Sequence, residues 1–336
     1  MILLWLLAAC GPPVQRHAEH GGWAAIFSRD GRTVLVGRAS GREGRIIDAR
    51  AGAVRCTMSA YSARALDLSG DGRHFLFADT AGDVATCAKT RLHEPFLAFQ
   101  QTLSDDGARV AELRFEDEHP WFQVRDLGQD EPLARMPFEP KDIAWAPDGS
   151  TVCGVDGGNP DVACLDVRSG DPLWRWNLGD VATWAHEPLV AVNEDGSLVA
   201  TSLGDDATWL FDRASGVPRG VLEPGRIDEV TALGFAASDP RRLAVGYRSG
   251  TIRVFDAGGS VLAQRSWNDA ARWRPLMLFD IELGRLLGQR GARAVHAVAL
   301  GSDLVLRAVY RDGLYAWPLD ELRVESVEPP EGVPDP

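Results

Sequence analysis

The stretch Ile26-Phe27-Ser28-Arg29-Asp30-Gly31 decides the fold, because its apolar strand followed by a polar Asp-Gly turn recurs along the chain. Four close copies and a weaker fifth one end at Gly72, Gly107, Gly149, Gly196 and Pro240. The steps between successive turns are 41, 35, 42, 47 and 44 residues. Self-similarity at a period of this size indicates a protein built from structural repeats.

A second landmark follows each of these turns: a β-branched or aromatic run ends in Asp and leads into a turn that contains Gly. Examples are Ile46-Ile47-Asp48, Val124-Arg125-Asp126, Cys164-Leu165-Asp166, Leu210-Phe211-Asp212 and Val254-Phe255-Asp256. Alternating apolar residues predict strands, and Asp-Gly between two such runs predicts a hairpin. Each repeat is therefore predicted to be a small antiparallel sheet of three or four strands.

A period near 40 residues with four strands per unit is typical of β-propeller blades. The sequence thus predicts an all-β, seven-bladed propeller in one domain over residues 23–325. Eight blades, one of them partial, are the alternative, because residues 268–293 form an irregular stretch before the last blade. The ring is expected to close through residues 14–20 or 322–327, and the Pro-rich tail 326–336 is expected to be unstructured.

The composition excludes several classes of protein. The 336 residues are 45% hydrophobic and 25% charged, which excludes a disordered, collagen-like or coiled-coil chain. The net charge of −13 argues against nucleic acid as a partner, because phosphate binding requires a surplus of Lys and Arg. We expect a monomer that binds protein partners.

The N-terminal residues bear on the cellular location of the protein. Residues 2–7 are all apolar, and Gly11-Pro12-Pro13 follow Cys10. The run Leu7-Ala8-Ala9-Cys10 resembles the lipobox of bacterial lipoproteins, although no Lys or Arg precedes the apolar run. The resemblance implies a signal peptide over 1–9, a lipidated Cys10 with a short tether over 10–22, and a place in the bacterial envelope, facing the periplasm or the cell surface. The alternative is an apolar N-terminal strand that packs on the core.

The Ser-x-Asp-Gly turns and the run Gly250-Thr251-Ile252-Arg253-Val254-Phe255-Asp256 resemble WD40-type repeats. No Trp-Asp dipeptide closes a strand, so the side-chain hydrogen-bond tetrad of that family is not carried over. We expect apolar packing between neighbouring sheets to hold the blades together. The resemblance implies a non-catalytic scaffold for protein–protein interaction.

One further resemblance implies an alternative function. The run from Cys164 to Trp176 is similar to the repeat of quinoprotein-like propellers, which implies a dehydrogenase acting through the central channel. Under the scaffold hypothesis, Trp174 and Trp176 pack between blades. The sequence lacks a nucleophile elbow, a phosphate-binding loop and metal-ligand spacing, so no catalytic residue, metal or cofactor is assigned. An enzyme requires convergent polar groups with displaced pKa values at the channel mouth, and a scaffold requires none. A small-ligand or cation sensor is the third possibility.

Charge is unevenly distributed: residues 101–223 contain 24 acidic and nine basic side chains, and residues 224–295 contain seven and 11. The loops that join the second and third strands of every blade lie on one face of a propeller. We expect this face to be acidic on one side and basic on the other, either as a solvated rim or as a docking surface. The candidate binding-face residues are Glu116, Asp117, Glu118, Asp156, Asp161, Asp205, Asp206, Arg248, Arg38, Arg42 and Arg45.

The cysteines allow one register argument. If Asp156 faces Asp161 across a hairpin, Cys153 lies directly opposite Cys164, at a distance that a disulfide accepts. We therefore expect a Cys153–Cys164 disulfide in an oxidising envelope, with two buried thiols as the alternative. Cys56 and Cys87 fall on different blades and are not expected to pair.

Overall fold

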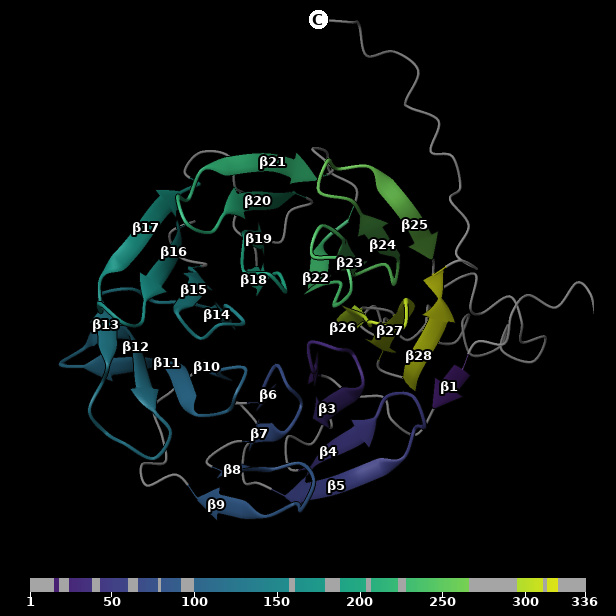
Figure 1. The fold of residues 1–336 in the computed structure, drawn as a ribbon, viewed down its shortest axis with the longest axis horizontal. Helices are drawn as coiled ribbons and strands as arrows, with labels where there is room; N and C mark the ends of the chain where they lie inside the picture. Colours follow the sequence, from purple (N-terminus) through teal and green to yellow (C-terminus); the bar gives the residue numbers. More distant parts are fainter. Residues whose placement is uncertain are drawn as a thin grey trace, which may run out of the picture.

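The computed structural model describes residues 15–17, 24–37, 43–59, 66–77, 80–91, 100–156, 161–178, 188–203, 207–222, 228–265, 295–310 and 313–319. These residues form seven antiparallel sheets of four strands, arranged as a ring around a central channel (Figure 1). The predicted all-β, seven-bladed propeller is confirmed.

Each of the first six blades takes four consecutive strands, from the channel outward. Blade one comprises β2 (Ala24–Phe27), β3 (Thr33–Gly37), β4 (Glu43–Asp48) and β5 (Val54–Ser59). Blade two comprises β6 (Leu66–Leu68), β7 (His74–Phe77), β8 (Thr80–Asp83) and β9 (Lys89–Arg91). Blade three comprises β10 (Gln101–Leu103), β11 (Arg109–Glu116), β12 (His119–Asp126) and β13 (Ala134–Met136). Blade four comprises β14 (Asp142–Trp145), β15 (Thr151–Val155), β16 (Asp161–Asp166) and β17 (Pro172–Asn177). Blade five comprises β18 (Leu189–Val192), β19 (Leu198–Ser202), β20 (Thr208–Asp212) and β21 (Pro218–Leu222). Blade six comprises β22 (Val230–Phe235), β23 (Leu243–Tyr247), β24 (Ile252–Phe255) and β25 (Val261–Arg265).

The seventh blade joins the two ends of the chain. Its three inner strands are β26 (Val295–Leu300), β27 (Val305–Tyr310) and β28 (Gly313–Pro318), and its outer strand is β1 (Gln15–His17). Gln15 pairs with Ala316 and His17 with Leu314. The structure thus uses the first of the two closures considered above, and the tether expected over residues 10–22 includes a strand of the propeller.

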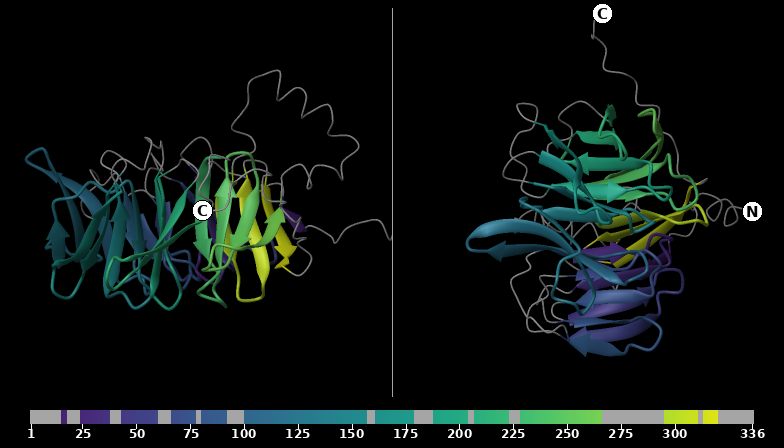
Figure 2. Two further views of the ribbon diagram at one scale, coloured as in Figure 1. Left: turned by 90° about the horizontal axis from the view of Figure 1, so that it is seen from above. Right: turned by 60° about the vertical axis from the view of Figure 1, so that its left-hand side comes forward.

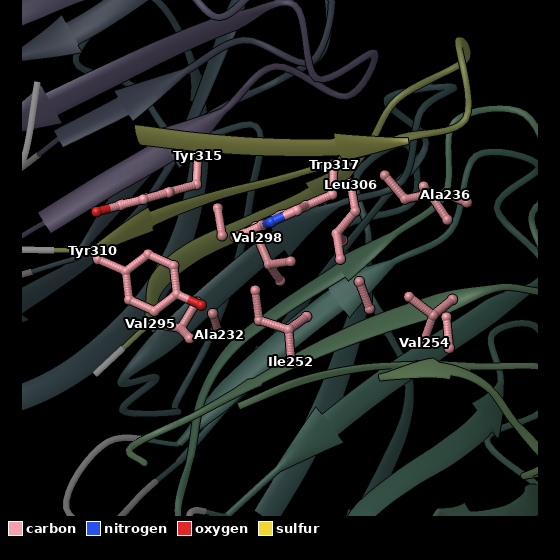
Figure 3. Packing of buried hydrophobic residues seen from close by; sticks show 14 residues of the cluster. Ala232, Ala236, Ile252, Val254, Val295, Val298, Leu306, Tyr310, Tyr315 and Trp317 are labelled. Atoms are coloured by element: carbon pink, nitrogen blue, oxygen red, sulfur yellow. The ribbon is translucent and has the colours of Figure 1, made fainter. Parts of the chain in front are cut away.

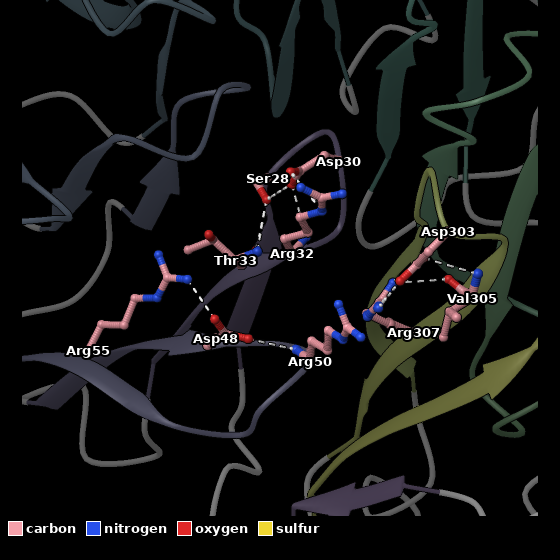
Figure 4. Close-up of polar contacts among 10 residues, drawn as sticks. All are labelled: Ser28, Asp30, Arg32, Thr33, Asp48, Arg50, Arg55, Asp303, Val305 and Arg307. Carbon is pink, nitrogen blue, oxygen red and sulfur yellow. Dashed lines mark hydrogen bonds and ion pairs between the residues drawn. The ribbon is translucent and has the colours of Figure 1, made fainter.

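The repeated Ser-x-Asp-Gly turn is a small hydrogen-bonded unit. In blade one, Ser28 Oγ accepts a hydrogen bond from Thr33 N at 3.0 Å and donates one to Asp30 Oδ1 at 2.7 Å (Figure 4). The same Asp30 oxygen accepts a bond from Arg32 N at 2.9 Å. Gly31 has a φ of 69°, a conformation that glycine adopts without steric cost. This geometry explains why the motif recurs where the first strand turns into the second.

The core is divided into seven apolar clusters, each between two neighbouring blades. Successive strand residues point to opposite faces of a sheet, so Leu35 packs toward blade two while Val34 and Val36 pack toward blade seven. The largest cluster lies between blades six and seven and includes Ile252 and Trp317 (Figure 3). The expected inter-blade apolar packing is confirmed.

The contact between blades two and three is mostly polar instead. Among the described residues, the apolar cluster at this contact has only three buried residues, Leu76, Ala81 and Leu103. Beside it lies the fully buried Glu112, whose carboxylate accepts hydrogen bonds from Arg125 Nε at 2.8 Å and Arg114 Nε at 2.8 Å. Gln101 and Gln123 also donate to this carboxylate, at 3.0 and 2.9 Å. A charged network thus fills a contact that is apolar between the other blades.

The propeller has two faces that differ in their connections. The turn face carries the turns between first and second strands and between third and fourth strands. The loop face carries the connections between second and third strands. β11 and β12 are eight residues long and form a hairpin that projects from the ring at the loop face (Figure 2). This projecting hairpin distinguishes blade three from the other blades.

Candidate functional site

The central channel contains a cavity of about 300 Å³, lined by the first strands of the blades. Most of its lining is aliphatic, from residues such as Ile26, Ala191 and Val298. Four carboxylates also line it, Asp67 of β6, Asp142 of β14, Asp105 and Glu194, together with the cation Arg29. A cavity of this volume is at the lower end of the range of small-ligand sites, and its lining combines aliphatic with charged side chains.

Asp67 is almost completely buried, and its carboxylate joins two blades. Its Oδ2 accepts a hydrogen bond from Leu103 N of blade three, and the Thr102 side chain donates another. Burial raises the pKa of Asp67 to about 7, against the opposing effect of these donors.

Asp142 has the corresponding role between blades four and five. Its Oδ2 accepts a hydrogen bond from Val190 N at 2.8 Å. Burial raises the pKa of Asp142 to about 6, and the Asp142 charge further raises the pKa of Asp67. The channel therefore holds two carboxyl groups that take up protons near neutral pH.

At the turn face, the mouth of the channel is crossed by Arg29 of blade one. Arg29 Nε and Nη2 donate to the two carboxylate oxygens of Asp105 in blade three, at 2.9 and 2.8 Å. Arg29 Nη2 also donates to Trp145 O at 3.4 Å, and Nη1 donates to Val192 O at 3.2 Å. One guanidinium thus bridges blades one, three, four and five. Burial raises the pKa of Asp105 even beside this cation.

The residues at this mouth occupy one position of the repeat, directly after the first residue of each turn. That position holds Arg29, Gly70, Asp105, Pro147 and Glu194 in blades one to five. Burial, together with the charges of Asp105 and Asp30, raises the pKa of Glu194. The sequence contained this signal, since the five turns align, but the aligned residues have no shared chemistry that would mark them as a cluster.

Polar groups with displaced pKa values therefore converge in the channel and at its mouth, which is the feature that the dehydrogenase hypothesis requires and the scaffold hypothesis does not. Within the described ranges, no group of three or more His, Cys, Asp or Glu side chains is placed to hold a metal ion. Asp67 and Asp142 accept bonds from backbone N–H groups of the next blade, and Asp105 is held by Arg29. These groups therefore link different blades of the propeller to each other, independently of any ligand.

The predicted binding-face residues Glu116, Asp117 and Glu118 form the tip of the projecting hairpin. Glu116 pairs with His119 in the strand register, which leaves Asp117 and Glu118 as a two-residue turn. Both turn residues have positive φ, 49° and 67°, as a tight hairpin of matching twist requires. Glu116 Oε2 accepts a bond from Arg135 Nη1 at 3.2 Å. The tip thus carries three carboxylates beyond the rest of blade three.

Asp156 and Asp161 are placed differently from the prediction. They flank the β15–β16 connection on the loop face, but only 6% and 3% of their surface is exposed. Asp161 accepts bonds from Arg175 Nε at 2.9 Å and Asn177 Nδ2 at 2.6 Å. Both carboxylates are internal, and Arg175 and Asn177 of the neighbouring strand β17 cover that of Asp161. They do not contribute to an exposed acidic surface.

Two predicted basic residues of the face, Arg45 and Arg248, form local ion pairs with Glu43 and Glu229, at 2.6 and 2.8 Å. The remaining predicted residues, Arg38, Arg42, Asp205, Asp206 and the lipidation candidate Cys10, lie outside the described residues.

Trp174 packs against blade five. Its ring stacks on Phe211 with centroids 5.8 Å apart, and its Nε1 donates to Arg213 O at 2.5 Å. Trp176 lies at 6.3 Å from the same Phe211 ring. These contacts agree with a packing role between blades for both tryptophans.

Two disulfides connect the four cysteines after Cys10. Cys153 lies opposite Cys164 in the β15–β16 register, as the sequence predicts, and the two form a disulfide in the structure. Cys56 of blade one and Cys87 of blade two also form a disulfide, with Cα atoms 5.7 Å apart. This second bond corrects the expectation that these two cysteines do not pair. Neighbouring blades pack against each other, so two cysteines on different blades can still lie within the distance that a disulfide requires.

Comparisons with known proteins define the class of fold. No protein-family model and no curated protein sequence matches this chain. Among solved structures, the chain is similar to the β-propeller domain of Cps50 (Swd1) from Myceliophteria thermophila, at 14% sequence identity. The match has a TM-score of 0.64 and covers 91% of this chain and 99% of that chain. The chain is therefore a seven-bladed β-propeller of WD40-like fold. None of the described residues forms a helix long and apolar enough to span a membrane.

Proposed function

We propose that this protein is a membrane-tethered scaffold of a bacterial cell envelope that binds a protein partner and catalyses no reaction. The observation that carries the proposal is the β11–β12 hairpin, which extends an acidic tip beyond the ring at the loop face (Figure 2). Exposed charges of one sign favour association with a partner of opposite charge and raise its association rate.

The proposed location in the cell envelope rests on the cysteines. The lipobox-like run ending at Cys10 supports a lipid anchor, and the pairing of the other four cysteines leaves Cys10 as the odd one. Disulfides persist in oxidising compartments such as the periplasm and the cell surface. An envelope location is thus consistent with every cysteine in the chain. The mass of the mature N-terminal peptide tests the anchor: a lipidated Cys10 supports it, and an intact Met1 contradicts it.

The interaction is tested by photo-crosslinking from position 117 in cells, followed by binding measurements with the purified partner. The test variant is Asp117→Arg with Glu118→Arg. The matched control is Asp130→Arg with Glu131→Arg, two exposed acidic residues of the same blade on its turn face. We expect only the hairpin variant to slow association, by about tenfold or more at low salt, and to lose its salt dependence. Equal effects of both variants would contradict the proposal.

The channel supports a second candidate, the binding of a small cationic ligand. The specific observation is the cavity of about 300 Å³ that Asp67 and Asp142 line. A bound cation would favour the ionised carboxyl groups and lower their pKa values. Calorimetric titration with a primary ammonium ion at pH 8, against Asp67→Asn as the control, tests this function. No heat of binding, or equal heat in both proteins, excludes this candidate.

A further inference from the structure

The first strand fixes the face of the propeller that lies next to the lipid anchor. Gln15 pairs with Ala316 toward the end of β28, and β28 runs from the loop face to the turn face. Leu319, directly after β28, donates its N–H to Leu304 O in the β26–β27 turn at 2.8 Å. The chain therefore enters β1 from the turn face of blade seven.

The length of chain between the anchor and this strand is short. Five residue steps separate Cys10 from Gln15. An extended chain spans at most about 3.5 Å per residue, so these steps reach about 18 Å. The turn face of blade seven is thus held close to a membrane that contains the Cys10 lipid. Blades three and four lie on the opposite side of the ring (Figure 1).

Charge favours the same arrangement. On the turn face next to the anchor, Arg32, Arg50 and Arg55 of blade one are exposed (Figure 4). The carboxylates beside them are paired with arginines: Asp30 with Arg32, at 3.7 Å, and Asp48 with Arg55, at 2.6 Å. At these positions blade one thus carries three arginines against two carboxylates.

The far side of the ring has the opposite character. Residues 101–223, which span blades three to five, contain 24 acidic and nine basic side chains, and of the acidic ones Glu112, Asp156 and Asp161 are buried. An anionic lipid surface attracts arginines within about 8 to 10 Å and repels carboxylates over the same range. Such a surface therefore favours contact with blade one over contact with blades three to five.

We infer that the turn face of blades seven and one rests on a phospholipid surface that contains anionic headgroups, and that the β11–β12 hairpin is held at the side away from it. This inference rests on the proposed lipid tether at Cys10. It assigns Arg32, Arg50 and the exposed Leu304 to the membrane-facing rim. It also gives the acidic hairpin tip an aqueous surrounding in which a partner has access.

Energy transfer to headgroup-labelled lipid tests the orientation on the lipidated full chain in vesicles. A single cysteine at Ala51, in the exposed β4–β5 turn, carries the fluorophore, and Asp117→Cys at the hairpin tip is the matched control. The two disulfides and the lipid leave no other cysteine to label. We expect several-fold higher transfer from Ala51→Cys than from Asp117→Cys. Equal transfer, or higher transfer from position 117, would overturn the inference.

A second pair of samples tests the role of charge. Arg32→Glu with Arg50→Glu, labelled at position 51, is expected to lower the transfer on vesicles that contain phosphatidylglycerol and to leave it unchanged on pure phosphatidylcholine. An unchanged transfer on both vesicle types would overturn the part of the inference that concerns anionic lipid. Flotation of the chain with the vesicles distinguishes a failure of the tether from a failure of the orientation. A chain that does not float with the vesicles refutes the tether and the orientation together, whereas a chain that floats with equal transfer refutes the orientation alone.

Discussion

Arg29 and Asp105 form an ion pair with two hydrogen bonds across the mouth of the channel, although they belong to blades one and three. Blade two lies between them and has Gly70 at the corresponding position of its repeat. A Cβ atom at Gly70 would lie 2.2 Å from Asp105 Oδ1. The ion pair therefore requires a residue without a side chain at position 70.

Gly70→Ala is expected to lower the free energy of unfolding by about 1 to 3 kcal/mol, the usual cost of adding a methyl group where no space exists. The matched control is Gly220→Ala in β21, where a Cβ would have no atom within 4 Å. Urea unfolding of both variants measures the difference.

The double variant Arg29→Met with Gly70→Ala shows whether the ion pair is the cause. Without Arg29 the Asp105 carboxylate can turn away, so the alanine should cost less in this background. If Gly70→Ala is as stable as Gly220→Ala, or costs the same with and without Arg29, the steric argument is wrong.

The channel carboxylates predict a fall in stability as the pH rises. The pKa of Asp67 is about 7 in the folded protein and near its ordinary value of 3.8 in the unfolded chain. Between these values the folded state binds more protons than the unfolded state, so the Asp67 contribution is present below pH 4 and is lost as the pH approaches 7. The same sign holds for Asp142, with a folded pKa of about 6.

Asp67→Asn should remove this dependence. We expect the stability of the variant relative to the natural protein to increase between pH 4 and pH 8, by at most about 4 kcal/mol for a shift of this size. Urea midpoints measured across this pH range provide the test. A difference between the two proteins that stays constant with pH would show that Asp67 ionises normally.

The buried Glu112 network predicts a large loss when one partner is removed. Arg125→Met leaves the Glu112 carboxylate without its closest buried cation, and such a change typically costs about 3 to 5 kcal/mol. Arg135→Met is the control, because it removes the exposed partner of Glu116 from the same sheet and should cost at most about 1 kcal/mol. Chemical unfolding of the two variants is the measurement, and similar losses would contradict a structural role for the network.

The sequence was sufficient to predict features that depend on local register. The Asp-Gly turns and their weaker copy at Pro240 mark six of the seven blades, and the hairpin expected between Asp156 and Asp161 predicts the opposition of Cys153 and Cys164. A hairpin fixes which residues face each other within a few positions, so a short stretch of sequence contains the answer.

Features that depend on contacts between blades were not predictable in the same way. The Cys56–Cys87 disulfide links an outer strand of one blade to a turn of the next, and no hairpin register relates the two. Arg29 and Asp105 lie 76 residues apart and meet only because the ring closes. Asp156 and Asp161 were expected to be exposed because they flank a loop, but both are buried, and Arg175 of β17 covers Asp161. Each of these outcomes depends on how neighbouring strands and sheets are placed.

The two disulfides predict different losses of stability. In the chain-entropy model a cross-link stabilises by restricting the unfolded chain, and the effect grows with the length of the loop. Cys56–Cys87 closes a separation of 31 residues and Cys153–Cys164 one of 11. Replacing both cysteines of the longer loop with alanine should therefore cost about 1 kcal/mol more than the same change in the shorter loop. Thermal unfolding of the two double variants measures this difference. Alkylation of the denatured protein without reductant should modify none of the four cysteines, and modification of Cys56 or Cys153 would show that the corresponding bond is absent in solution.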